Sequence, residues 1–211
     1  MNMIDIITSI FSPKVAIDIH NEVNAGCKFL QIDEEGEFSD IKKLTVNNLP
    51  DDCFAITLDI PQKNLDDSEK IAYSRLNHYF DKSNSVGLNK KCDLIIFAKL
   101  EEEQCVVVFD LKSKDPKPDA SAKQLLNSEI YVRYVLDVAA TFYDFDISCI
   151  KIIKVIGTTR IRKNISHIDI ERIEKIKKRK NEFLSCNIKE VKIIKKANNN
   201  GVLNFNEMVR L

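Results

Sequence analysis

The sequence predicts an α/β fold in which a central mixed β-sheet is flanked by helices and preceded by a β-rich N-terminal extension. From residue 15 to residue 60, apolar residues alternate with polar ones in short runs, as in β-strands. From residue 66 the predicted order is helix, strand, strand, helix, strand, helix, strand, which is typical of a sheet covered by helices. We therefore divide the chain into an extension over residues 1–63 and a core over residues 64–211.

Length and composition set the class of protein. A chain of 211 residues with 44% hydrophobic and 30% charged residues can bury a core without disulfides or structural metals. The six cysteines are far apart and form no CxxC pair, which indicates reduced thiols and argues against a zinc site. The 32 basic and 32 acidic residues cancel, so any nucleic-acid site must come from a local patch.

The sequence shows no targeting or membrane-spanning segment. The N-terminus lacks a basic region followed by a long apolar run, and no segment approaches the roughly 18 apolar residues of a membrane span. We expect a cytoplasmic protein without a membrane partner.

The extension begins with a predicted short helix over residues 3–10, which ends before Ser12-Pro13 because a residue that precedes proline disfavours the helical region. Three or four strands follow, which we expect to form a small antiparallel sheet: the alternating run 15–19, then KFLQI, KLTV and FAITLDI. A helix is predicted over residues 64–80, with Asp66, Asp67 or Ser68 as N-cap. Later elements are strands at 149–157 and 190–196, a helix at 168–183 and a short element at 202–211.

The stretch from residue 90 to residue 134 carries the candidate chemistry. If CDLIIFAKL and CVVVFDLK form an antiparallel hairpin, residues whose numbers sum to about 203 to 206 face each other, so Asp93 lies at or near Asp110. Opposed Cβ atoms in such a ladder are roughly 4.5–5.5 Å apart, and two carboxylates at that spacing require a cation or a lysine. Lys112 follows Asp110 by two residues and therefore projects from the same face of the strand.

Two acids and a lysine at the end of an apolar strand are the groups that a magnesium-dependent phosphodiester cleavage site requires. On the following helix, Gln124, Ser128 and Tyr131 form a polar stripe that we expect to face Asp110. A strand that ends in charged residues at the protein surface would also contain Asp110-Leu111-Lys112, so the tripeptide alone decides nothing.

These residues resemble the PD-(D/E)XK nuclease superfamily, which includes restriction endonucleases. The resemblance covers residues 66–196 by element order and is specific over residues 90–134. It implies a restriction-endonuclease-like core, metal ligation of Mg²⁺ or Mn²⁺ by Asp93 and Asp110, catalytic assistance by Lys112 and completion of the site by Gln124. The family often has an acid on the preceding helix, where Glu69 is the candidate. Cys92 stands where the family name has proline, and Asp110 stands where glutamate is commoner.

The resemblance also implies a metal-dependent nuclease with DNA favoured over RNA, similar to proteins of prokaryotic anti-phage defence. Four basic residues are candidate phosphate contacts: Lys123, Arg160, Arg162 and Lys163. The alternative is a catalytically inactive nuclease-like subunit that acts as a binding or assembly module, with a partner subunit or as a homo-oligomer. In either case the first 60 residues could form a partner-binding surface.

Other classes of enzyme find no support in the sequence. The three histidines are scattered, which argues against an HNH or zinc-peptidase site. No GxxxxGK[ST] loop and no GxGxxG turn is present, which argues against nucleotide hydrolysis and dinucleotide binding.

Overall fold

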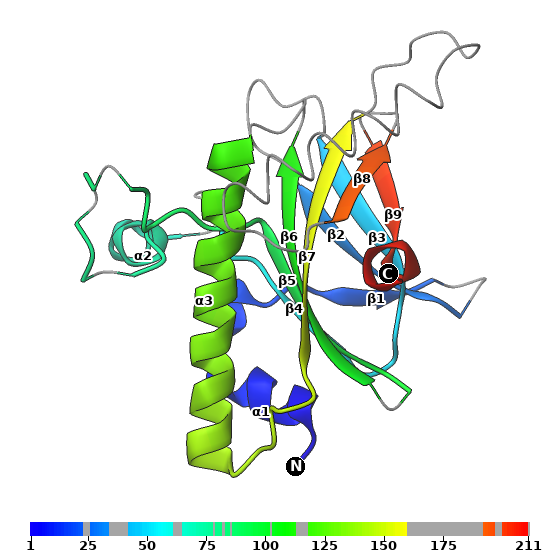
Figure 1. The fold of residues 1–211 in the computed structure, drawn as a ribbon. Coiled ribbons are helices and arrows are strands. Elements are labelled where there is room, and N and C mark those ends of the chain that lie inside the picture. Colours follow the sequence, from blue (N-terminus) through cyan, green and yellow to red (C-terminus); the bar gives the residue numbers. More distant parts are fainter. Residues whose placement is uncertain are drawn as a thin grey trace, which may run out of the picture.

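The computed structural model shows a mixed α/β fold with two mixed β-sheets flanked by helices (Figure 1). Within the part of the chain that is described, no helix is long and apolar enough to cross a bilayer. The predicted helix over 168–183 and the predicted phosphate contacts Arg160, Arg162 and Lys163 lie outside that part. The described residues are 1–22, 26–33, 42–60, 65–77, 79–81, 83–84, 86–101, 103–112, 118–159, 192–196 and 200–210.

A five-stranded sheet carries the candidate site. Its strand order is β4-β5-β6-β7-β8, with β4, β5 and β6 antiparallel and β6, β7 and β8 parallel. Strands β6 and β7 are parallel, so the chain must cross back along the sheet between them, and helix α3 (Pro118–Tyr143) forms this connection. The predicted hairpin and the two later strands are thus confirmed in one sheet. The strands are β4 (Cys53–Ile56), β5 (Leu94–Leu100), β6 (Glu103–Lys112), β7 (Lys151–Thr159) and β8 (Lys192–Lys196).

A four-stranded sheet combines the two ends of the chain. Its order is β1-β2-β3-β9, and its strands are β1 (Ile19–Asn21), β2 (Lys28–Asp33), β3 (Lys43–Leu49) and β9 (Asn200–Asn204). The first three are antiparallel as predicted, whereas β9 is parallel to β3. The prediction that the FAITLDI strand joins this sheet is wrong, because β4 pairs with β5. Strand β9 thus pairs with a strand of the predicted extension, and β4 of the extension pairs with a strand of the predicted core.

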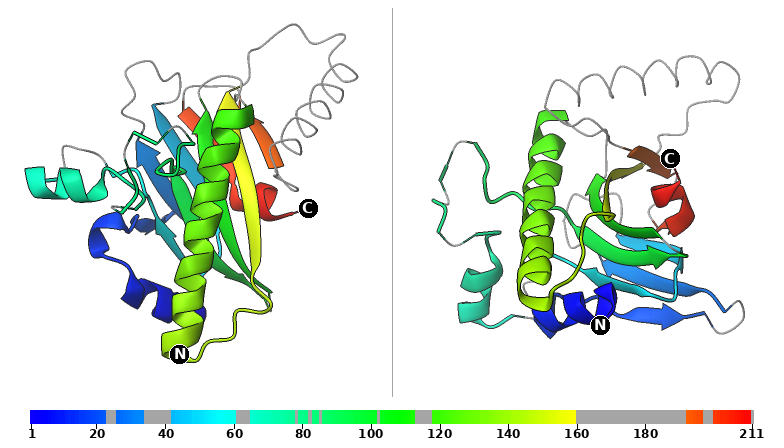
Figure 2. Two further views of the ribbon diagram at one scale, coloured as in Figure 1. Left: turned by 60° about the vertical axis from the view of Figure 1, so that its left-hand side comes forward. Right: turned by 60° about the horizontal axis from the view of Figure 1, so that its bottom comes forward.

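The five-stranded sheet is the middle layer of the fold (Figure 2). Alternate residues of β6 point to opposite faces: Val106 and Val108 pack with α3 and α1 (Met3–Ile10), whereas Val107 and Phe109 pack with the four-stranded sheet. Helix α5 (Phe205–Val209) packs against β3 of the four-stranded sheet. Both faces of β5 and β6 are buried, which explains why their sequences are almost continuously apolar.

Two local predictions are wrong. Residues 13–15 form a 3-10 turn that begins at Pro13 and Ala16 makes only an isolated antiparallel bridge to Ile56, so the first strand starts at Ile19. The helix predicted over 64–80 is the shorter α2 (Asp67–Tyr73), and Tyr79, expected on its apolar face, is 97% exposed. After α2 the asparagine and aspartate side chains bind nearby backbone amides, as Asn77 does to Tyr79, and such bonds favour turns over a helix.

Candidate active site

The register of the β5–β6 hairpin brings Asp93 beside Asp110. Leu94 pairs with Phe109, and the backbone amide of Asp93 donates to the Phe109 carbonyl oxygen at 3.2 Å. The Asp93 carboxylate accepts a hydrogen bond from the backbone amide of Leu111, with 2.5 Å between Oδ2 and N. The pairing predicted from the sequence is confirmed, and the Asp93 side chain lies against the strand segment that carries Asp110.

Asp110 is a fully buried carboxylate on the face of the sheet that α3 covers. The Lys112 ammonium lies 2.9 Å from each of its oxygens, with hydrogen-bond geometry to Oδ1. Burial of a carboxylate is costly unless a cation and hydrogen bonds compensate it. About a quarter of the Lys112 side chain is exposed, 25%, so its ammonium links the buried acid to the protein surface.

Gln124 of α3 joins this pair to the start of β5. Its Oε1 accepts from the Lys112 ammonium at 2.9 Å, and its Nε2 donates to the Lys91 carbonyl oxygen at 3.1 Å. These two bonds fix the orientation of the amide, because only the oxygen can face an ammonium and only the nitrogen can face a carbonyl. The structure thus brings together the four residues predicted for the site.

Two further residues of α3 bind the backbone just before Asp93. Ser128, which is fully buried, accepts a hydrogen bond from the Cys92 amide at 2.8 Å. Asn127 donates to the carbonyl oxygens of Gly87 at 2.7 Å and Lys90 at 3.2 Å. Sequence reasoning placed Ser128 in a polar stripe but missed Asn127, although Asn127 is three residues after Gln124 and so lies one turn further along the same side of the helix.

Two buried hydroxyl residues also escaped prediction. Thr158 of β7 is 1% exposed and pairs with Lys112 in the parallel ladder. Ser121 of α3 is fully buried, and its Oγ has no hydrogen-bond partner among the described residues. Its spacing of seven residues from Ser128 places both on one face of the helix, a signal that the sequence contained.

Burial shifts the pKa of the cysteine that precedes Asp93. Desolvation raises the pKa of the Cys92 thiol to about 12, although a hydrogen bond with Ser128 opposes that rise. Its Sγ also donates weakly to the Leu94 carbonyl oxygen at 3.5 Å. The buried Cys92 thiol is therefore neutral at ordinary pH.

Other predicted residues lie in different environments. Tyr131, expected in the polar stripe, packs its ring at 6.4 Å from that of Phe11 and joins the apolar core. Lys123, a candidate phosphate contact, forms an ion pair of 3.4 Å with Asp119 one turn earlier in α3. That pair does not prevent a phosphate contact, because both side chains are partly exposed.

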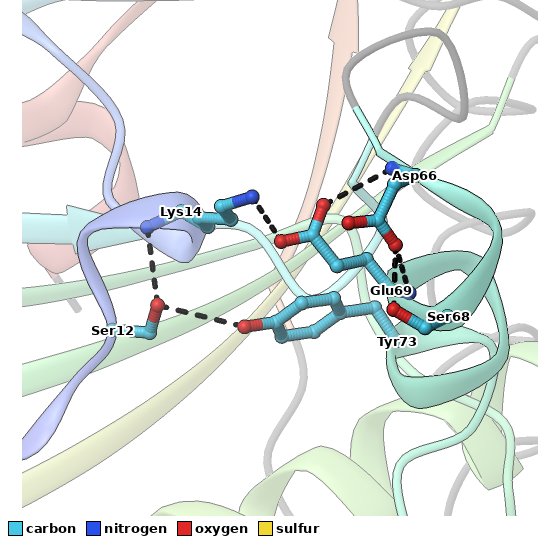
Figure 3. A network of polar contacts seen from close by, with 6 residues as sticks. All are labelled: Ser12, Lys14, Asp66, Ser68, Glu69 and Tyr73. Atoms are coloured by element: carbon cyan, nitrogen blue, oxygen red, sulfur yellow. Dashed lines mark hydrogen bonds and ion pairs between the residues drawn. The ribbon is translucent and has the colours of Figure 1, made fainter.

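Glu69, the acid on the preceding helix, belongs to a separate network (Figure 3). Its carboxylate binds the Lys14 ammonium and accepts from the Asp66 amide, while Asp66 accepts from the Glu69 amide, which makes a capping box at the start of α2. The Tyr73 hydroxyl donates to Ser12 at 3.5 Å. Glu69 thus binds the first turn of its own helix and the N-terminal segment. It is not one of the contacts that join Asp110, Lys112 and Gln124.

The donor set is suited to a small hard cation. Asp93, Asp110 and the Gln124 amide offer oxygen atoms, which Mg²⁺ and Mn²⁺ prefer. The residues that the structure describes contain no group of three or more His, Cys, Asp or Glu side chains placed to hold a metal. Mg²⁺ commonly binds through one or two carboxylates and completes its shell with water and substrate phosphate, so two aspartates are a sufficient protein contribution.

Comparisons with known proteins identify no family for this chain. No family model matches the chain, and neither the curated proteins nor the solved structures contain a match. The resemblance to PD-(D/E)XK nucleases stays a prediction from the sequence.

Proposed function

We propose that this chain is a metal-dependent nuclease that hydrolyses phosphodiester bonds, with DNA as its favoured substrate. The observation that carries the proposal is the contact of Lys112 with both Asp110 and Gln124, beside the Asp93 carboxylate. A fully buried aspartate at the end of an apolar strand is unfavourable for folding alone, which points to a chemical role.

Asp93 and Asp110 would hold the cation, and the Gln124 oxygen lies near Asp110 because both accept from Lys112 Nζ. When bound, Mg²⁺ or Mn²⁺ polarises a phosphate oxygen and lowers the pKa of a water molecule. The backbone amide of Leu111 donates to Asp93 Oδ2 and so restrains that carboxylate. The Lys112 ammonium compensates the charge of the second carboxylate, which is buried.

Lys112 would position the attacking water and stabilise negative charge on the phosphate. Its hydrogen bonds to Asp110 Oδ1 and Gln124 Oε1 use two of the three donors of an ammonium. Among the described residues no other side chain hydrogen-bonds the ammonium, so its third donor can face a substrate oxygen, and the exposed quarter of the side chain gives access from solvent. Because Gln124 and Asp110 restrain the ammonium, little orientational freedom is lost when the substrate binds.

The proposal is tested by incubating plasmid DNA and a matched RNA with the protein and Mg²⁺ or Mn²⁺. We expect metal-dependent cleavage by the parent and its loss in Asp110→Asn and Lys112→Met, both of which preserve side-chain size. Lys99→Met is the matched control, because Lys99 is an exposed lysine of the same hairpin. Equal cleavage by Lys112→Met and Lys99→Met would refute the proposal.

Calorimetric titration with Mn²⁺ separates the nuclease from an inactive binding module. A nuclease requires a Mn²⁺ site that Asp110→Asn removes. An inactive module has no need of metal at the two aspartates, so absence of Mn²⁺ binding by the parent would favour that alternative.

A further inference from the structure

Helix α3 holds the chain just before Asp93 through three polar side chains, Gln124, Asn127 and Ser128, that lie within little more than one helical turn. Asn127 donates to the carbonyl oxygens of Gly87 and Lys90, at 2.7 and 3.2 Å. Gln124 donates to the Lys91 carbonyl oxygen, and Ser128 accepts from the Cys92 amide at 2.8 Å. Residues 87–92 are thus bound to the helix up to the residue that precedes Asp93.

The last of these bonds is the most buried. Ser128 and Cys92 are both fully buried, so no water can replace the serine oxygen as acceptor for the Cys92 amide. The serine oxygen can accept this bond whichever way its hydroxyl donates, and the Cys92 amide lies two residues before β5 begins. The bond therefore ties the backbone of α3 to the backbone at the entry of β5.

The position of Asp93 depends on that entry. Downstream of Cys92, the Asp93 amide donates to the Phe109 carbonyl oxygen and the carboxylate accepts from Leu111. These contacts fix Asp93 relative to β6, while Ser128 fixes the preceding residue relative to α3. Since α3 also carries Gln124, one helix sets the positions of Asp93 and of the Lys112 ammonium together.

We propose that Ser128 is a positioning residue that holds the Asp93 carboxylate in place for a divalent cation, with Asn127 in a supporting role. This inference rests on the nuclease function proposed above. A site of this kind requires its ligands to be held within roughly 0.5 Å, and second-shell hydrogen bonds supply that precision. Loss of such a partner commonly weakens metal affinity about 10- to 100-fold.

The chain offers a matched control for Ser128. Ser121 lies two turns earlier on the same face of α3 and is equally buried, but its Oγ has no hydrogen-bond partner among the described residues. Ser128→Ala and Ser121→Ala thus remove the same atom from the same helix, and only the first removes a bond to the β5 entry. Asn127→Ala, at a partly exposed position, is a second variant that does not disturb the core.

The experiment combines two measurements on the full chain. Amide hydrogen exchange on the metal-free protein follows the Cys92 amide and the Leu111 amide, which report on the Ser128 bond and on the Asp93 carboxylate. Calorimetry then gives the Mn²⁺ affinity. We expect Ser128→Ala to accelerate exchange at both amides by about tenfold or more and to weaken Mn²⁺ binding about 10- to 100-fold. Asn127→Ala should change both in the same direction but less, and Ser121→Ala should match the parent.

Two outcomes would overturn the inference: exchange at Leu111 in Ser128→Ala equal to that in Ser121→Ala, or Mn²⁺ affinity equal in the two variants. If the parent binds no Mn²⁺, the proposed function fails on its own. In that case the exchange measurement still decides whether Ser128 positions the Asp93 carboxylate.

Discussion

The Lys112 ammonium lies 2.9 Å from each carboxylate oxygen of Asp110, which is completely buried, while the lysine is 25% exposed. The pair is therefore asymmetric with respect to solvent. Removal of the lysine would leave a buried negative charge, whereas removal of the aspartate would leave a cation that can reach water by rotating its flexible chain.

This asymmetry predicts that Lys112→Met is more destabilising than Asp110→Asn. Breaking a buried ion pair from one side typically costs about 3–5 kcal/mol, and the exposure of Lys112 favours the lower end of that range. The double variant Asp110→Asn/Lys112→Met removes both charges and should recover much of the loss. Urea unfolding at neutral pH in the absence of divalent cations measures all three. A Lys112→Met protein as stable as the parent would show that the pair contributes nothing to folding.

Gln124→Leu should impair the site more than the fold. Leucine has a similar volume but lacks the bonds to the Lys112 ammonium and to the Lys91 carbonyl oxygen. Gln124 is partly exposed, so water can replace both partners, and we expect a loss of only about 1 kcal/mol in unfolding free energy. Cleavage of DNA should fall at least about tenfold, because the ammonium loses one of its two restraints. A large loss of stability with unchanged cleavage would assign Gln124 to the core.

The hairpin and its site residues were predictable because their signals are local. An antiparallel pair of strands with buried faces permits few registers, since a shift of the pairing by one residue would move every side chain to the opposite face of the sheet. Asp93 therefore had to lie near Asp110, and the two-residue spacing put Lys112 on the same face. The position of Gln124 followed from helical periodicity on the next element.

The distribution of strands between the sheets was not predictable in the same way. Strand β9 pairs with β3 from the far end of the chain, and nothing local in VLNF specifies a parallel partner 157 residues earlier, as Lys43 is for Asn200. Strand β4 pairs with β5 because Ala55 and Ile56 are both buried, one on each face of the central layer. Buried hydroxyls such as Ser121 and Thr158 were missed since serine and threonine are common on exposed surfaces.

As the pH falls, helix α2 should lose its helical structure before the two sheets unfold. A hydrogen bond from Ser68 and another from the Glu69 amide lower the pKa of Asp66 below its ordinary 3.8. The bond from Lys14 and the Asp66 amide lower the pKa of Glu69 below 4.5. A carboxyl group with a lowered pKa stabilises the fold above its ordinary pKa, and this contribution disappears as the pH falls through the lower folded value. No residue of α2 is buried, so few other contacts hold it.

Amide chemical shifts of residues 67–73, followed from pH 6 to about pH 2, check this prediction. Asp66→Asn is the matched control, because asparagine caps a helix well but does not titrate in this range. Its α2 should lose less structure on acidification than that of the parent. A parent helix that persists unchanged after Asp66 and Glu69 are protonated would contradict the assigned role of the capping box.

Replacing Gly157 of β7 by any larger residue should destabilise the protein for a steric reason. A Cβ at this position would lie 2.5 Å from Cζ and 2.9 Å from Cε2 of Phe109, and that ring is fully buried against the four-stranded sheet. Because the ring cannot move outward, Gly157→Ala should destabilise the protein by about 1–3 kcal/mol. Phe109 precedes Asp110, so a displaced ring would also shift the strand that carries the buried carboxylate and reduce cleavage.

Gly201 of β9 provides the comparison. There the nearest atom to an added Cβ is Leu44 Cδ1 at 3.3 Å, the end of a flexible side chain that can adjust. Replacement of glycine by alanine also lowers the entropy of the unfolded chain, which favours folding by about 0.4–1 kcal/mol where the site tolerates it. Gly201→Ala should therefore be neutral or slightly stabilising in thermal unfolding, whereas Gly157→Ala lowers the midpoint. If both variants melt at the parent's midpoint, Phe109 does not pack as closely on β7 as the structure shows.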